Sequence, residues 1–182
     1  MIDLGMISDI RDGTVIDHLP AGSALNVLWL ALGCGPGHPE PTTTYNVGMN
    51  QPSKRSGKED IIKIEDRELT PDEYHKIALV AWAYGAGQMP TINTIKKYKV
   101  TNKTTPELAD RYERVVDCHY PDCITNNPDE RELGRKTVLV RREDKFYCDY
   151  CRREQEPKEV REGIELDMRR SMGLVTMPLR CP

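Results

Sequence analysis

The sequence lacks a long apolar run, an excess of basic residues and, almost entirely, phenylalanine. No apolar stretch reaches the ~18 residues of a membrane span, and the start has neither the basic residues nor the cleavage site of a secretory signal. Lysine and arginine number 26 against 29 aspartates and glutamates, for a net charge of −3. Nucleic-acid binding by phosphate neutralisation needs a basic surface, so this balance argues against it.

Cysteine is concentrated in the second half of the chain, where four of the six residues form two pairs, Cys118-x4-Cys123 and Cys148-x2-Cys151. Without a secretory signal we expect a cytoplasmic protein, whose cysteines are metal ligands or thiols before they are disulfides. Cys34 and Cys181 have no partner at ligand spacing and are interpreted as free thiols.

The two cysteine pairs have the ligand number and spacing of a four-thiolate zinc site. The segments 137–140 and 145–147 between them read as a hairpin, which would return the second pair to the first. We therefore predict one structural zinc ion per chain, bound by Cys118, Cys123, Cys148 and Cys151. A redox Cys-x-x-Cys is the alternative, but it would not require the first pair. Four thiolates leave no open position for catalysis at the metal.

The first hundred residues alternate between strand and helix patterns. Strands are expected at 14–16, 42–49, 61–65 and 91–100, helices at 21–32 and 70–82, and a turn at 51–57. This β-α-β-β-α-β order is the ferredoxin-like pattern, which places both helices on one face of the sheet and leaves the other face free for binding.

The predicted fold class is α+β, with an N-terminal ferredoxin-like (βαββαβ) domain followed by a small β-rich four-cysteine zinc domain. The expected limits are 1–105 for the first domain, 106–153 for the zinc domain and 154–182 for a C-terminal extension. Pro157 can open a helix with Val160, Ile164, Met168 and Met172 on one side and Gly173 as its stop. A disordered tail and an amphipathic helix that packs on a partner both remain open for this extension.

Several motifs occur together in one order: Gly13 to His18, Gly57-x-x-Asp60 to Glu65, Asn93-x-Ile95-x-x-Tyr98-x-Val100-x-x-Lys103, and the two cysteine pairs. In this order and spacing the sequence resembles the regulatory chain of aspartate carbamoyltransferase over about residues 7–153. The resemblance implies a chain without catalytic activity. In that family the N-terminal domain binds ATP and CTP, often with UTP, and also forms a regulatory dimer. The zinc domain docks on the catalytic chain, so that nucleotides control pyrimidine biosynthesis.

The resemblance also implies a set of nucleotide-binding residues whose chemistry suits that role. Asp17 can accept hydrogen bonds from ribose hydroxyls, His18 and Lys103 can meet phosphate charge, and Lys63 and Asn93 can bond to a ribose or a base. The full set is Ile10, Asp17, His18, Lys63, Asn93, Ile95, Tyr98, Val100 and Lys103, and Ile7 matches a further apolar position. Tyr120, Asp122 and Arg152 occupy places that contact the catalytic chain in the family.

Three other functions remain open at this point. A nucleotide sensor of the same fold would act on a different partner. A zinc-ribbon protein that binds nucleic acid would need a basic knuckle, which Arg141-Arg142 and Arg152-Arg153 supply in part. An enzyme with Cys148 and Cys151 as a dithiol would contain reactive thiols and no stoichiometric zinc.

Overall fold

The structure is a computed structural model that describes residues 9–35, 37–85, 87 and 89–174. Ile7 and Cys181, named above, lie outside these residues. The chain divides into two compact units. The first unit comprises Met1–Cys34, Pro39–Trp82 and Ala86–Leu108, and the second comprises Gly35–His38, Ala83–Gly85 and Ala109–Pro182. No helix in the described part of the chain has the length and apolar character to cross a membrane. The domain limits expected from the sequence remain a prediction: 1–105, 106–153 and 154–182.

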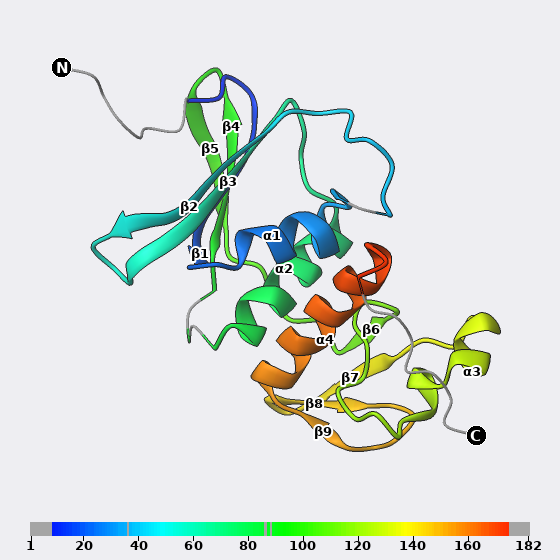
Figure 1. Ribbon diagram of the computed structural model, residues 1–182. Helices are drawn as coiled ribbons and strands as arrows, with labels where there is room; N and C mark the ends of the chain where they lie inside the picture. Colours follow the sequence, from blue (N-terminus) through cyan, green and yellow to red (C-terminus); the bar gives the residue numbers. More distant parts are fainter. Residues whose placement is uncertain (1–8, 36, 86, 88, 175–182) are drawn as a thin grey trace. The chain divides into compact units, whose positions relative to one another are not determined.

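The first unit contains one five-stranded antiparallel sheet with helices on one side (Figure 1). Its elements are β1 (Gly13–Pro20), α1 (Ala24–Asn26), the π-helical turn η1 (Val27–Ala31), β2 (Tyr45–Ser53), β3 (Gly57–Glu65), α2 (Pro71–Ala83), β4 (Thr91–Lys96) and β5 (Lys99–Thr104). The strand order is β2-β3-β1-β4-β5. The first four strands have the ferredoxin-like arrangement, which confirms the predicted fold class, and β5 extends the sheet beyond β4.

The apolar core of this unit lies between the sheet and its helices. Ile16 of β1 pairs with Ile62 of β3 and with Ile92 of β4, and all three side chains are buried. Directly paired residues of antiparallel strands point to the same side of a sheet. The intervening residues therefore point to the other side, which we term the helix-free face.

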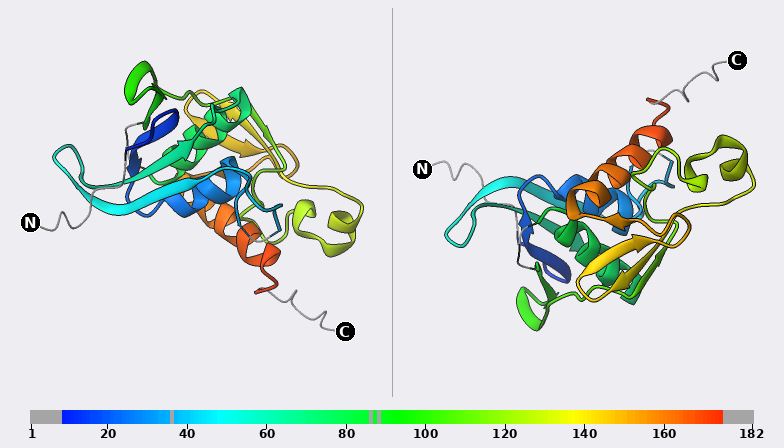
Figure 2. Two further views of the ribbon diagram at one scale, coloured as in Figure 1. Left: turned by 90° about the horizontal axis from the view of Figure 1, so that it is seen from above. Right: turned by 90° about the horizontal axis from the view of Figure 1, so that it is seen from below.

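Three strands, β1, β2 and β3, are longer than the sequence predicted. Residues 51–53 belong to β2, so the turn to β3 covers only 54–56, and the hairpin end of β2 and β3 projects beyond the neighbouring strands (Figure 1, Figure 2). Pro20 ends β1, and the first helix begins at Ala24 rather than at residue 21. The predicted single strand 91–100 is wrong, because Lys97 and Tyr98 turn the chain and β5 returns beside β4.

The start of α2 is a capping box formed by Thr70 and Glu73. The Thr70 hydroxyl accepts a hydrogen bond from the Glu73 backbone N–H at 3.3 Å, and the Glu73 carboxylate accepts one from the Thr70 N–H at 2.7 Å. These bonds satisfy backbone donors that the first helical turn leaves unpaired. Two other side chains of α2, Ile77 and Ala78, are fully buried.

The second unit contains a four-stranded antiparallel sheet of order β6-β7-β8-β9. Its elements are β6 (Arg111–Glu113), the 3-10 turn η2 (Ile124–Asn126), α3 (Pro128–Glu132), β7 (Val138–Arg142), β8 (Lys145–Cys148), β9 (Glu154–Gln155) and α4 (Pro157–Ser171). The predicted hairpin is present, since Val140 pairs with Tyr147 between β7 and β8.

Helix α4 begins at Pro157 and packs on the unit that contains the cysteines. Val160 and Ile164 are buried, and Gly163 lies so close to the Asp117 carbonyl that an added Cβ would be 2.4 Å from its oxygen. The Asp117 carboxylate bonds to Arg131 of α3 through one oxygen and to Arg170 of α4 through the other. The extension is therefore a helix of this unit as far as Ser171, rather than a disordered tail.

Candidate functional site

The four predicted metal ligands converge in the second unit. The Sγ atoms of Cys118, Cys123, Cys148 and Cys151 all lie within 4.8 Å of one another. The Cys118–Cys151 and Cys123–Cys148 sulfur distances are both 3.8 Å. Zinc–sulfur bonds of about 2.3 Å in a tetrahedron give sulfur–sulfur edges of roughly 3.8 Å. The donor set therefore fits a four-coordinate zinc ion in both chemistry and spacing.

Short turns and polar neighbours orient these sulfur atoms. Cys118 precedes a turn in which the Cys123 N–H donates to the Tyr120 carbonyl at 3.0 Å. Thr125 lies 3.2 Å from the Cys123 sulfur and accepts a hydrogen bond from Thr137 at 3.1 Å, so its own hydroxyl proton can point at the sulfur. Outer hydrogen bonds of this kind fix the direction of metal ligands.

The cysteine thiols influence one another's ionisation. The hydrogen bond from Cys118 lowers the pKa of Cys148 to about 5. The same bond, and then burial, raise the pKa of Cys118, while burial raises that of Cys151. One thiolate is thus stabilised by its neighbours, whereas several thiolates repel each other without a cation. A divalent metal supplies the charge that allows all four to ionise.

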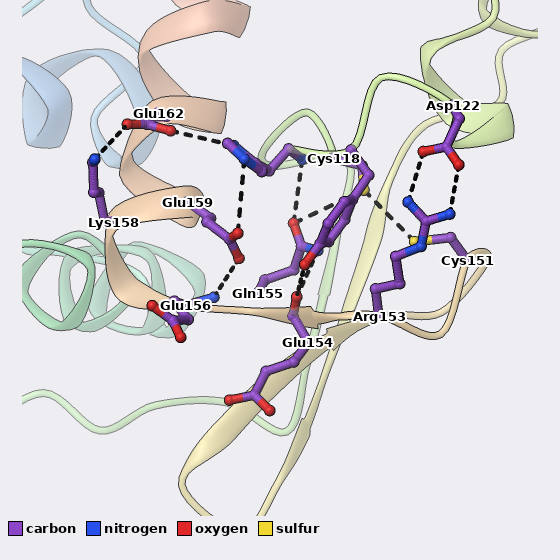
Figure 3. Close-up of polar contacts among 12 residues, drawn as sticks. Cys118, Asp122, Cys151, Arg153, Glu154, Gln155, Glu156, Lys158, Glu159 and Glu162 are labelled. Atoms are coloured by element: carbon purple, nitrogen blue, oxygen red, sulfur yellow. Dashed lines mark hydrogen bonds and ion pairs between the residues drawn. The ribbon is translucent and has the colours of Figure 1, made fainter.

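An arginine covers the outer side of the first cysteine turn. The Arg153 guanidinium donates to both oxygens of Asp122, at 2.6 and 2.5 Å, and lies 4.7 Å from the centre of the Tyr120 ring (Figure 3). Arg152 bonds to Asp149 at 2.7 Å. The three positions expected to meet a catalytic chain, Tyr120, Asp122 and Arg152, therefore already have partners within this unit, and the pKa of Asp122 is lowered by its bond to Arg153.

Gln155 and α4 hold the other side of this turn. The Gln155 side chain is buried, and its oxygen accepts from the His119 backbone N–H at 3.2 Å and lies 3.8 Å from the Cys118 sulfur. The Nε2 atom of His119 lies 3.7 Å from a carboxylate oxygen of Glu159, and its Nδ1 atom lies 3.2 Å from one of Glu162. Both glutamates are on α4 (Figure 3). The first pair of ligands is thus fixed by residues that follow the second pair in sequence.

On the helix-free face of the first unit, four strands place one residue each in a single row. Lys63 of β3 pairs with Val15 of β1, Val15 pairs with Asn93 of β4, and Asn93 pairs with Lys103 of β5. Asp17 pairs with Thr91 in a neighbouring row. On the other side of the row, Ile95 pairs with Gly13 and with Val100. The sheet therefore brings Asp17, Lys63, Asn93, Ile95, Val100 and Lys103 to one surface.

The predicted residues on and around this face lie in different environments. Tyr98 is in the β4–β5 turn and is 68% exposed, and Val100 is 58% exposed. Lys63 and Asn93 are largely buried, and the Lys63 ammonium lies 3.4 Å from Asp9. Ile10 is buried, next to Arg11, whose carbonyl accepts from the Tyr98 N–H at 2.8 Å.

His18 lies at a bulge in β1 and interacts with two carboxylates. Its φ is +60°, and the pairing of β1 with β3 shifts register between Ile16 and Leu19. The Nδ1 atom lies 2.8 Å from Glu59, and Nε2 lies 3.6 Å from Asp17. Burial favours a higher pKa for Glu59, but hydrogen bonds from Ser53 and His18 hold it below its ordinary value. Asp17, His18 and Glu59 could each offer one atom to a metal, and these three atoms lie within 4.8 Å of one another. The contacts of the His18 ring with the two carboxylates explain this cluster without a metal.

Sequence reasoning missed two residues at these sites. Val15 lies at the centre of the row, and the alternation of Thr14, Val15 and Ile16 would have placed it beside Asp17. Thr125 carried no such signal, because its partner Thr137 is distant in sequence.

Comparison with known proteins links both units to one kind of chain. The family model for the allosteric domain of the aspartate carbamoyltransferase regulatory chain matches residues 5–107, and the model for its metal-binding domain matches 110–161. Aspartate carbamoyltransferase regulatory chains are similar over most of their lengths. That of Pyrococcus furiosus is 37% identical over 154 residues, 85% of this chain and 94% of the relative. That of Korarchaeum cryptofilum is 40% identical over 146 residues, which cover 80% of this chain and 87% of the relative. That of Pyrobaculum islandicum is 43% identical over 160 residues, which cover 85% of this chain and 96% of the relative.

Proposed function

The chain belongs to the family of aspartate carbamoyltransferase regulatory chains, and on this premise we propose that it binds nucleoside phosphates on its helix-free face and one structural zinc ion in its second unit. As a regulatory chain it is a non-catalytic subunit whose partner is the catalytic chain. The proposed effectors are CTP and ATP, with UTP as a further candidate.

The row Lys63–Val15–Asn93–Lys103 is the observation that supports nucleotide binding most directly. It combines two ammonium groups, an amide that both donates and accepts, and an apolar centre across four adjacent strands. Asp17 beside it can accept from ribose hydroxyls, and the exposed Tyr98 ring and Val100 offer apolar contact to a base. These are the groups that a nucleoside phosphate needs in one place.

In the second unit, zinc would be held by Cys118, Cys123, Cys148 and Cys151 and would supply folding energy rather than chemistry. Reduced thiolates are required, which favours the cytoplasm. The surface around the first cysteine turn, with Tyr120 and Asp122, would face the catalytic chain, as residues at those places do in the family.

Control of the catalytic chain would follow from linkage. A nucleotide changes activity only if it binds two states of the assembly with different affinity, and the usual coupling is about 1–3 kcal/mol. We further propose that the first units pair as regulatory dimers that bridge catalytic trimers.

The test is the mass, by light scattering after size exclusion, of this chain mixed with the catalytic chain from the same source. We expect one stable complex with the mass of catalytic trimers bridged by regulatory dimers. A Cys148→Ser variant is the control and should form no such complex. Absence of a complex with the zinc-loaded wild type, while nucleotide still binds, would instead support a nucleotide sensor with another partner.

A further inference from the structure

The turn between β2 and β3 carries a local excess of positive charge. Residues 53–58, Ser-Lys-Arg-Ser-Gly-Lys, include three cationic side chains and no acidic one. Lys54, Arg55 and Lys58 are all exposed, and none of them forms an ion pair with another residue that the structure describes. The turn lies at the projecting end of the β2–β3 hairpin (Figure 1, Figure 2). Its cations are therefore available to an anion.

Hydrogen bonds connect this turn to His18. The Ser53 hydroxyl accepts from the Arg55 backbone N–H at 3.2 Å and from the Ser56 N–H at 3.4 Å. The same hydroxyl donates to the Glu59 carboxylate, which also lies 2.8 Å from Nδ1 of His18. Burial of Glu59 opposes its ionisation, whereas Ser53, His18 and then the charge of Arg55 lower its pKa. Arg55 therefore lies close enough for its charge to act at the His18 end of the helix-free face.

The strand register places this turn at the phosphate end of the proposed nucleotide site. Gly13 of β1 pairs with Ile95, at the end proposed for the base. At the opposite end of β1, Pro20 pairs with Glu59, near His18. From Glu59 the hairpin continues past the end of β1 to its turn. A phosphate chain that passes His18 in the direction away from the base therefore approaches Arg55.

Without this turn the helix-free face has no excess of positive charge. Three carboxylates stand beside two ammonium groups and one imidazole there: Asp9, Asp17, Glu59, Lys63, Lys103 and His18. Phosphate oxygens are bound by cationic side chains or by backbone N–H groups. Arg55 adds a guanidinium beside Glu59, the carboxylate that would otherwise repel a phosphate next to His18. Each further phosphate adds negative charge, so a triphosphate gains most from this arginine.

We propose that Arg55 is a specificity-determining residue of the nucleotide site, which binds the terminal phosphates and so selects nucleoside triphosphates over monophosphates. The inference rests on the proposed nucleotide function of the helix-free face and adds a phosphate contact to that same site. A guanidinium suits this role, because its planar fork can donate two hydrogen bonds to one phosphate group. The single phosphate of a monophosphate remains near His18 and does not reach the turn.

The experiment is isothermal titration of the full zinc-loaded chain with CMP, CDP and CTP, without added divalent cation. For the wild type we expect CTP to bind most tightly. Arg55→Gln should weaken CTP binding about tenfold, because a charged hydrogen-bond donor is lost, and CMP binding less than about threefold. Arg55→Lys should keep part of the preference for CTP, since it retains the charge but not the planar fork.

Lys58→Gln is the matched control. It removes the same charge from the same hairpin, but Lys58 precedes Glu59 in β3, and successive residues of a strand point to opposite sides of the sheet. The ratio of CTP affinity to CMP affinity should therefore stay at its wild-type value. The bond from the Arg55 N–H to Ser53 survives every substitution at Arg55, so the turn keeps its backbone hydrogen bond.

Two results would overturn the role of Arg55 and leave nucleotide binding in place. One is a wild type that binds CTP no more tightly than CMP. The other is an Arg55→Gln variant whose CTP-to-CMP affinity ratio changes no more than that of Lys58→Gln. If none of the three nucleotides binds to the wild type, the proposed nucleotide function itself fails.

Discussion

Asp117 shows how one buried carboxylate organises the second unit. It is 5% exposed, and its two oxygens bond to arginines from α3 and α4. Burial of a charge is unfavourable unless it is paired and hydrogen-bonded. Each arginine therefore does more than add a surface ion pair, because it donates to an oxygen of a largely buried carboxylate.

Replacing Arg170 with methionine should destabilise the second unit by about 2 kcal/mol, since one oxygen of the buried Asp117 loses a charged hydrogen-bond donor. Arg169→Met on the same helix is the control, because Arg169 is 61% exposed and its nearest acid, Glu165, is 4.0 Å away. That change should stay within about 0.5 kcal/mol. Urea unfolding, monitored through a signal from the second unit, measures the change in the free energy of unfolding for both variants. Equal changes in the two variants would contradict the role of Asp117.

The hydrogen bonds that Glu59 accepts from Ser53 and His18 make the stability of the first unit depend on pH. Because the pKa of Glu59 lies below its ordinary value of 4.5, ionised Glu59 favours the folded state. This contribution is complete above about pH 4.5 and is lost as the pH falls through the lowered value. Glu59→Gln should therefore reduce stability at pH 7 and have a smaller effect at pH 3.5, as measured by denaturant unfolding. A difference that grows toward acid pH would refute the assignment.

At the scale of elements, the β4–β5 hairpin depends on a turn of unusual composition. Lys97 and Tyr98 have φ values of +50° and +62°, as in a type I′ turn, where asparagine and glycine are preferred. A side chain at such a residue costs roughly 1 kcal/mol. The turn also places the exposed Tyr98 ring at the edge of the helix-free face, which gives a reason to retain it.

Lys97→Gly should stabilise the first unit by about 0.5–1 kcal/mol, because glycine adopts positive φ without strain. The Lys97 N–H donates to Asp12 at 3.0 Å, and this bond survives the substitution. Lys99→Gly, in the adjacent strand, should destabilise instead, since it only adds backbone freedom. If the turn is strained as described, thermal unfolding of the two variants gives shifts of opposite sign in the midpoint temperature.

The same hairpin marks the limit of prediction from sequence. The order of strands and helices followed from apolar spacing and from the capping box at Thr70, which are local signals. The division of 91–104 into two strands could not be predicted, because Lys97-Tyr98 contains no turn residue. The packing of α4 could not be predicted either, since the partners Asp117 and Arg170 are far apart in sequence.

At the scale of the whole chain, the two units differ in what stabilises them. The first unit has an apolar core between the sheet and its helices, including Ile16, Ile62 and Ile77 at 0% exposure. The second unit buries Phe146 and Leu139, but three of its four clustered cysteines are also among its buried residues. We therefore expect this small sheet to need a metal bound to the four cysteines in order to fold.

Chelation of the metal should therefore unfold the second unit, including α4, and leave the first unit folded. Hydrogen exchange measured before and after chelator addition should show loss of protection in β6 to β9 and in α4, with protection of β1 to β5 retained. Equal loss in both units would show that they fold together, and retained protection in α4 alone would show that it is stable without the cysteine cluster.

The bond between Asp117 and Arg170 also acts as a cross-link. It joins residues 53 positions apart and so closes a loop that contains α3 and the β7–β8 hairpin. The entropy of closing a flexible loop grows only with the logarithm of its length, by about 0.6 kcal/mol for each doubling. Insertion of a few polar residues between the exposed Glu143 and Asp144 should hence leave α4 docked, and this turn is where the unit can accept an epitope or a fluorophore tag.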